Sequence, residues 1–154
     1  MSFAWLSTLS SIAVCAQSIA GAPSFPWHDG DKAPIVAGVH LGDTQEQITQ
    51  ALGSPAETQK LGEHQLAFMF PLRGVTVAWA SLDGAAIILL NTREAGDIGG
   101  VRIGDSRDDI LSKWGAPSTA GEGTAIYVAG PWCVVLKLDE NNLVVQLYLG
   151  RVAQ

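Results

Sequence analysis

The fold of this chain is decided by the stretch Gly38-Val39-His40-Leu41-Gly42-Asp43-Thr44-Gln45-Glu46-Gln47-Ile48-Thr49-Gln50-Ala51-Leu52-Gly53-Ser54-Pro55, because it occurs twice. The second version is Gly100-Val101-Arg102-Ile103-Gly104-Asp105-Ser106-Arg107-Asp108-Asp109-Ile110-Leu111-Ser112-Lys113-Trp114-Gly115-Ala116-Pro117. Seven of these 18 aligned positions are identical, and no compositional bias explains an ungapped match of that length. The sequence therefore predicts an internal duplication, with repeat 1 over residues 35–92 and repeat 2 over residues 97–151.

Each copy predicts one short helix, over residues 44–52 and 106–114. Thr44 and Ser106 each stand three residues before a side chain that completes a capping box. Each helix also carries two apolar residues four positions apart, which gives it one apolar stripe. A Gly and, two residues later, a Pro then end the helix in both copies.

Alternating and apolar runs predict antiparallel strands after each helix. They lie near residues 56–61, 65–70, 74–81 and 85–91, and again near 124–129, 131–138 and 143–149. Asp83-Gly84 is a hairpin signal, and the run Ala85–Leu90 is apolar on both faces, as in a central strand covered on each side. We therefore expect an α+β fold made of two tandem helix-plus-antiparallel-sheet repeats. The short polar link over residues 92–97 would let both units share one continuous sheet.

Composition narrows the class of protein. The 154 residues carry a net charge of −6, which argues against nucleic acid because no basic stripe exists to neutralise phosphates. No run approaches the roughly 18 apolar residues that a transmembrane helix needs. The 47% hydrophobic content is that of a globular protein.

The N-terminal residues leave alternatives open. Residues 1–20 are apolar, small and uncharged in their centre, which favours a signal peptide and hence a periplasmic or secreted protein. The competing interpretations are a retained N-terminal helix, with a cytoplasmic location, or a lipid anchor at Cys15. The anchor is less favoured because Val14 stands where such signals want Gly, Ala or Ser. Residues 21–34, with three prolines, predict an irregular lead-in.

The duplicated motif resembles the repeat of the SmpA/OmlA small outer-membrane lipoproteins, and its tandem arrangement resembles the β-lactamase-inhibitory protein superfamily. The resemblance covers about residues 36–150 and rests on the 18-residue motif. It implies helices on one face of a curved antiparallel sheet, in a secreted or envelope protein that acts by binding. The motif residues, such as Gly42, Asp43 and their partners Gly104 and Asp105, make caps and turns, so we give them no functional role.

The strands of the second repeat hold the candidate partner-binding residues. One face of these strands mixes apolar and polar side chains, as protein-docking surfaces often do. The candidate contacts are Val135, Lys137, Val144, Gln146 and Tyr148, and their counterparts in the first repeat are Thr76 and Ala78. An ordinary amphipathic sheet with scattered surface apolar residues explains the same pattern.

No catalytic constellation stands out in the sequence. The three histidines, His28, His40 and His64, have no carboxylate or nucleophile at a telling spacing, and Cys133 lies mid-strand without a neighbouring His. A Cys15–Cys133 bridge is open if Cys15 is retained, and otherwise Cys133 is a lone thiol. We expect no enzyme, cofactor or metal, but a protein-binding module of the envelope or secreted space. A structural component of an envelope assembly is the alternative, and a small-ligand carrier or enzyme is less favoured.

Overall fold

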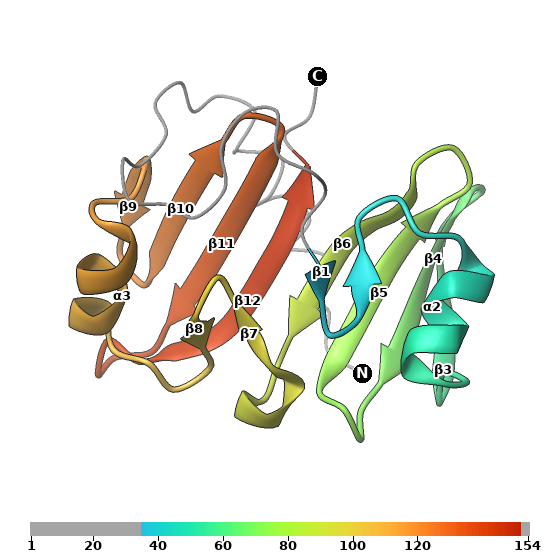
Figure 1. The fold of residues 1–154 in the computed structure, drawn as a ribbon, viewed down its shortest axis with the longest axis horizontal. Helices are drawn as coiled ribbons and strands as arrows, with labels where there is room; N and C mark the ends of the chain where they lie inside the picture. Colours follow the sequence, from blue (N-terminus) through green and yellow to red (C-terminus); the bar gives the residue numbers. More distant parts are fainter. Residues whose placement is uncertain (1–34, 152–154) are drawn as a thin grey trace.

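The computed structural model describes residues 35–151, and its centre is one antiparallel sheet of eight strands (Figure 1). The strands lie in the order β3-β4-β5-β6-β12-β11-β10-β9. Their bounds are β3 Glu57–Gly62, β4 Gln65–Phe70, β5 Val75–Ala80, β6 Gly84–Leu90, β9 Thr119–Gly121, β10 Thr124–Ala129, β11 Trp132–Leu138 and β12 Val144–Arg151. β6 and β12 join the two halves of the sheet as an antiparallel pair, with Leu89 opposite Tyr148.

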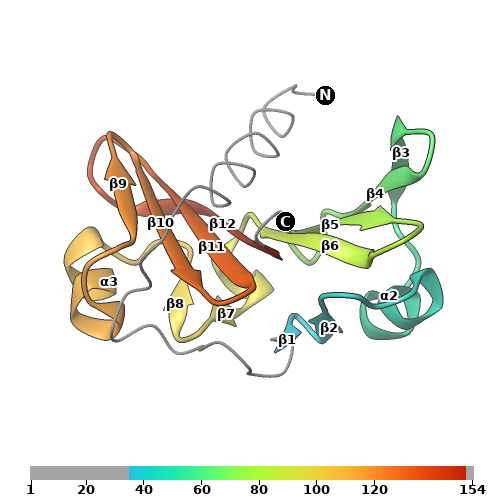
Figure 2. The ribbon, with the colours of Figure 1, turned by 90° about the horizontal axis from the view of Figure 1, so that it is seen from above.

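The smaller elements all precede the long strands of their own half. They are the hairpin of β1 Ile35–Val36 and β2 Val39–His40, helix α2 Gln45–Leu52, the 3-10 helix η2 Arg93–Ala95, the hairpin of β7 Asp97–Ile98 and β8 Val101–Arg102, and helix α3 Arg107–Trp114. Figure 2 shows both hairpins and both α-helices on the same side of the sheet, while β3 and β9 rise on the other side. Within residues 35–151 no helix lies on the other side, which we call the helix-free face.

The expected α+β class is wrong. The described residues are 50% strand and 16% helix, and their two α-helices have eight residues each. The long strands do not form two helix-plus-sheet units but one large sheet. The physical reason lies at its middle, where β6 and β12 bury side chains on both faces. The backbone N–H and C=O groups of β6 and β12 pair with each other, so neither strand leaves unpaired backbone groups buried between the two halves.

The strand positions themselves follow the alternation in the sequence. All seven expected strands are present close to their expected bounds, and the Asp83-Gly84 hairpin joins β5 to β6 as predicted. Sequence reasoning missed β9 and the four two-residue strands. β9 is three exposed residues at the edge of the sheet, too short to show a period, and its pairing with β10 is not local information.

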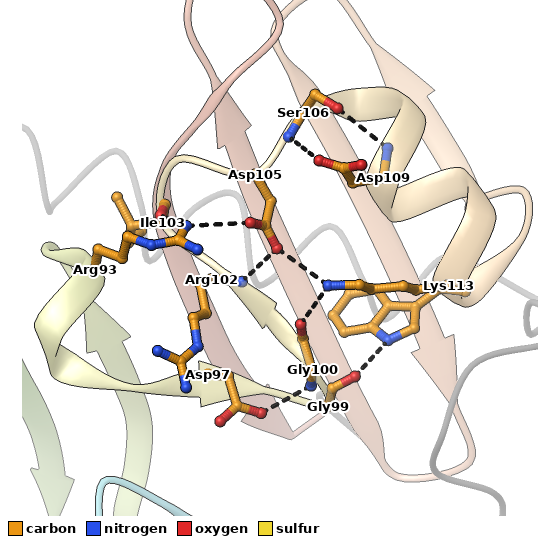
Figure 3. Close-up of polar contacts among 11 residues, drawn as sticks. Arg93, Asp97, Gly99, Gly100, Arg102, Ile103, Asp105, Ser106, Asp109 and Lys113 are labelled. Atoms are coloured by element: carbon orange, nitrogen blue, oxygen red, sulfur yellow. Dashed lines mark hydrogen bonds and ion pairs between the residues drawn. The ribbon is translucent and has the colours of Figure 1, made fainter.

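Both predicted helices are confirmed, with their caps. In α2 the Thr44 side chain accepts from the backbone N–H of Gln47, whose own side chain accepts from the Thr44 N–H. Ser106 and Asp109 make the same reciprocal pair at α3 (Figure 3). These bonds satisfy backbone donors that a helix start leaves free, which is why eight-residue helices persist here.

The turn before α3 is held by a buried carboxylate, Asp105 (Figure 3). It accepts from the backbone N–H of Arg102 at 3.0 Å and from Nη1 of Arg93 at 3.2 Å, and Nζ of Lys113 lies 3.5 Å away. Burial alone would raise the pKa of Asp105, but these three donors outweigh it and hold the pKa below its usual value. Asp43 in the first copy accepts from the backbone N–H of His40, 2.9 Å away. Both aspartates are structural groups.

Each turn docks on the last strand of its own half through backbone bonds. Gly42 N–H donates to the Ala85 carbonyl and Ala85 N–H to the Asp43 carbonyl, both at 2.8 Å. In the second half Gly104 N–H donates to the Val144 carbonyl at 2.8 Å, and Val144 N–H to the Asp105 carbonyl at 2.9 Å. The duplicated motif thus ties the helix layer to β6 and to β12 at corresponding places.

The main core fills the space between the sheet and the helix layer. It combines the apolar stripes of both helices with alternate residues of the long strands. Its most buried large side chains include Ile48, Ile88, Leu90, Trp114, Tyr127 and Leu147. Trp114 of α3 packs edge-on against Tyr127 of β10, with ring centroids 5.0 Å apart.

Candidate partner-binding face

The helix-free face has two unlike parts. The part over β10, β11 and β12 holds a second apolar cluster made of Leu89, Ile126, Val128, Cys133, Val135 and Tyr148. Cys133, Val135 and Tyr148 are 0% exposed. In the part over β4, β5 and β6 several side chains remain partly exposed to solvent. We call them the covered part and the open part of the helix-free face.

The structure places four of the five predicted contacts on the helix-free face. Val135 and Tyr148 stand opposite each other in β11 and β12, inside the covered part. Lys137 and Gln146 are the next same-face pair along these strands and are half-buried. The Tyr148 hydroxyl donates to Oε1 of Gln146, and Nε2 of Gln146 donates to Oδ1 of Asn91 at 3.3 Å. The set stays a prediction, and its two largest apolar members lie beneath the surface.

The fifth predicted contact, Val144, lies on the wrong face. Alternation counted back from Tyr148 puts Val144 on the helix-free face, yet it is 1% exposed in the main core. In the pairing of β11 with β12, Lys137 lies opposite Gln146, but the next residue, Leu138, lies opposite Val144. Val145 therefore has no partner in β11 and is an extra residue of β12. Such a bulge reverses the alternation. The backbone bonds that Val144 makes with the Gly104–Asp105 turn hold it there.

The open part contains the predicted first-half positions, Thr76 and Ala78. Its side chains on β4 to β6 are small or neutral: Gln65, Ala67, Met69, Thr76, Ala78, Ala80 and Ile87. An open depression of about 80 Å³ lies here, lined by Leu61, Gln65, Ala78, Trp79, Ala80, Ala86 and Ile87. A register shift opposite Ala78 and Trp79 makes Ala86 the extra residue of β6. The alanines form the floor because their side chains end at Cβ.

The titratable residues of the described chain show no assembled catalytic centre. Nδ1 of His40 lies 3.8 Å from Oδ2 of Asp43, at a solvent-exposed turn. Within residues 35–151 no three side chains of His, Cys, Asp or Glu gather closely enough to hold a metal ion. Cys133 is disulfide-bonded.

Sequence reasoning missed the covered part as a cluster. Its signal was present, since β10 and β11 carry apolar residues on both faces, as β6 does. The predicted signal peptide, the lead-in and the lipid anchor at Cys15 lie outside the described residues.

Comparisons with known proteins give structural neighbours only. No protein-family model matches the chain, and no curated protein matches it. A cysteine-rich secretory protein from Staphylococcus aureus subsp. aureus Mu50 superposes with a TM-score of 0.63 at 13% identity, over 79% of this chain and 48% of that protein. An extracellular protein containing an SCP domain, from Bacillus anthracis str. Ames, gives 0.52 at 10% identity, over 80% and 48%.

A third neighbour matches over nearly its whole length. It is a DUF4309 family protein, YjgB, from Bacillus subtilis subsp. subtilis str. 168, with a TM-score of 0.50, 10% identity, and 91% and 92% of the two chains covered. The chain spans about half the length of the first two neighbours. Such low identities show a shared fold alone. None of these proteins bears on the SmpA/OmlA or β-lactamase-inhibitory resemblance, which stays a prediction. Among the described helices, none has the length and apolarity to cross a membrane.

Proposed function

We propose that the chain is a secreted, non-enzymatic protein-binding module, and that its partner docks on the open part of the helix-free face. The single observation that carries this proposal is the absence of charge there. The chain has a net charge of −6, yet the side chains of β4, β5 and β6 on this face include no Asp, Glu, Lys or Arg. Depletion of charge at the centre of a patch distinguishes protein interfaces from ordinary surface.

The shape of the open part favours a protein over a small molecule. Sites for small ligands usually enclose about 300–1,000 Å³ and bury most of the ligand. The depression here holds only about 80 Å³, well below that range, and it is open to solvent. Its alanine floor lets another backbone or one apolar side chain approach closely. Gln65 lines the depression and Thr76 lies farther along the same face, and both offer neutral hydrogen-bonding groups that suit a rim.

Export is supported by the chemistry of Cys133 and by the neighbours. Disulfides persist in oxidising compartments and are rare in the cytosol. Two of the neighbours are described as secretory or extracellular proteins. A non-enzymatic role is supported by the buried carboxylate Asp105, which is committed to Arg93, Arg102 and Lys113.

The test compares variants in affinity isolation from the extracellular and envelope fractions of the source organism. Ala80→Arg introduces a long charged side chain at the depression and should abolish retention of the specific partner. Leu72→Arg is the matched control, since Leu72 is fully exposed in the turn between β4 and β5, at the far end of β5. Thermal unfolding of both variants confirms that they are folded.

A protein retained by the wild type and by Leu72→Arg, but lost by Ala80→Arg, supports the proposal. Retention that is equal for all three, or lost equally in both variants, contradicts it. Purification of a stoichiometric membrane assembly insensitive to Ala80→Arg would instead favour the structural-component alternative.

A further inference from the structure

Strand β3 forms the outer edge of the sheet in the first half. The strand order places β4 on one side of it and no described strand on the other. β3 has six residues, whereas β9 at the opposite edge has three. Figure 2 shows β3 rising on the helix-free side, while α2 lies on the other side. A strand added to β3 would therefore continue the sheet away from α2.

The direction of the backbone groups in β4 follows from one hydrogen bond. The Ala56 N–H donates to the Met69 carbonyl at 2.9 Å, so Met69 turns its backbone groups toward β3. In antiparallel sheets the N–H and C=O groups of successive residues point alternately to the two sides of a strand. Ala67, two residues before Met69, therefore also turns its backbone groups toward β3.

Two residues of β3 then have backbone groups that point away from the sheet. Glu57 and Gln59 lie opposite the two β4 residues that face β3, so they turn their N–H and C=O groups inward. Thr58 and Lys60 alternate with them and turn these groups outward, where the described chain provides no strand. The side chains of both residues are exposed. Such an edge is a template for pairing with another extended chain.

We propose that β3 pairs with β3 of a second copy of this chain, antiparallel and about a two-fold axis at Gln59. Directly opposite residues of antiparallel strands share a face, and an axis perpendicular to the sheet keeps each face on its own side. Thr58 then lies opposite Lys60 of the second copy, and Lys60 lies opposite Thr58 of the second copy. Each such pair exchanges two N–H···O bonds, so the two pairs make four.

Other two-fold registers use this edge less well. An axis at Lys60 would place two ammonium groups directly opposite each other, which is destabilising. An axis at Thr58 would form one outward pair and set Lys60 opposite Ala56, whose N–H already donates to Met69. The axis at Gln59 pairs both outward residues and puts no like charges directly opposite.

The Gln59 side chain supports this register independently. Its Oε1 is buried and has no hydrogen-bond partner within residues 35–151. A buried acceptor without a donor is uncommon in folded proteins. In the proposed pairing the two Gln59 residues face each other as a non-hydrogen-bonded pair, with Cα atoms about 4.5 Å apart. After rotation of the terminal torsion, Nε2 of each amide can donate to Oε1 of the other.

The pairing goes beyond the proposed partner on the open part and does not depend on it. Because the axis is perpendicular to the sheet, the open parts of the two copies face the same way. The dimer would present two docking surfaces on one side of a continuous sheet.

Sedimentation velocity of the whole chain, over a range of concentrations, measures the pairing. Thr58→Pro removes one outward N–H from each copy, and an edge strand tolerates proline where its N–H faces solvent. We expect the wild type to dimerise with a dissociation constant below about 1 mM, and Thr58→Pro to raise that constant by roughly tenfold or more. Thr58→Val keeps the N–H and is the matched control, which should leave the constant unchanged. Thermal unfolding checks that each variant is folded.

A disulfide test fixes the register even if proline disturbs β3. Oxidised glutathione takes one hydrogen from each of two cysteine thiols and becomes two glutathione thiols, as the S–S bond forms. Cα atoms about 4.5 Å apart lie within reach of such a bond. We expect Gln59→Cys to link two copies, seen as two peptides of residues 33–60 joined in an unreduced tryptic digest. Thr58→Cys and Lys60→Cys, whose like residues are not opposite, should link far more slowly.

Several results would overturn the proposal. One is a wild type that stays monomeric up to about 1 mM, which would leave the edge to a strand of a different protein. Another is a dimer equally stable in Thr58→Pro and Thr58→Val, and a third is slower linkage of Gln59→Cys than of its two neighbours. Ala80→Arg should leave dimerisation unchanged, so failure of the dimer and failure of the open-part partner are distinct outcomes.

Discussion

Gly84 lies against Gly42 so closely that a Cβ atom on Gly84 would stand 2.3 Å from the Gly42 carbonyl oxygen. Gly42 belongs to the duplicated turn before α2, and Gly84 begins β6. The contact lets Gly42 and Asp43 exchange backbone hydrogen bonds with Ala85. The contact makes the hairpin glycine a packing residue as well as a turn residue.

Replacing Gly84 with alanine should therefore destabilise the chain. The φ angle of Gly84 is +71°, which strains any residue with a Cβ, and the clash is with backbone that cannot rotate away. We expect Gly84→Ala to lower the free energy of unfolding by about 2–4 kcal/mol in denaturant titration. Gly121→Ala is the control, because its φ is not positive and nothing lies within 4 Å of the added atom. Equal losses in the two variants would contradict the close contact.

Asp105 should make stability depend on pH in the acid range. Its folded pKa lies below the ordinary aspartate value of 3.8, so the unfolded state takes up a proton first as the pH falls. The stabilisation is fully present above pH 3.8 and is lost as the pH falls through the folded pKa. Asp105→Asn should lower stability at pH 7 by about 1–3 kcal/mol and flatten the profile below pH 4. An unchanged acid limb in this variant would rule out the role of the carboxylate.

Tyr127 should act at the opposite end of the pH scale. Burial raises its pKa to about 12, although Arg107 opposes the shift, and its hydroxyl donates to the Gly115 carbonyl at 2.8 Å. The unfolded tyrosine ionises near pH 10, so the wild type should lose stability between pH 10 and 12. Tyr127→Phe should cost about 1–2 kcal/mol at pH 7 and lose less of its remaining stability over that window. Denaturant titrations of the wild type and of Tyr127→Phe at pH 10 and pH 12 measure the two losses, and equal losses would contradict the role of Tyr127.

The bulge in β12 predicts opposite outcomes for two adjacent valines. Val144 is 1% exposed in the main core, whereas Val145 is 41% exposed. Val144→Asp should cost more than about 4 kcal/mol, because it buries a carboxylate without a partner, and Val145→Asp should stay within about 0.5 kcal/mol of the wild type. Comparable losses, or a larger loss for Val145→Asp, would restore the simple alternation that the sequence suggested.

The elements that the sequence predicted well are those with local signals. The capping boxes at Thr44 and Ser106 and the Asp83-Gly84 hairpin depend on residues within a few positions of each other. The pairing of β6 with β12 joins residues far apart in the chain, and no local pattern encodes it. A shared sheet was expected, but the fold class was wrong because strands make up half of the described residues and the eight-stranded sheet is not divided into two helix-plus-sheet units.

The candidate site was predicted in part. Thr76, Ala78, Val135, Lys137, Gln146 and Tyr148 do lie on the helix-free face, since period-two alternation is reliable along uninterrupted strands. Val144 failed because the docking of the Gly104–Asp105 turn requires an extra residue in β12. The full burial of Val135 and Tyr148 was not predictable from one strand, because alternation gives the face on which a side chain lies and not its depth.

The central claim, that a protein docks on the open part of the helix-free face, is tested most directly by site-specific photocrosslinking. A photoreactive amino acid is placed at Ala80, or at Leu72 as the control position, and each protein is irradiated in the native extracellular fraction. We predict one discrete crosslinked protein from position Ala80, absent from Leu72, and suppressed by excess unlabelled wild type but not by excess Ala86→Arg. Crosslinks from Leu72 alone, or suppression by both competitors alike, would contradict the claim.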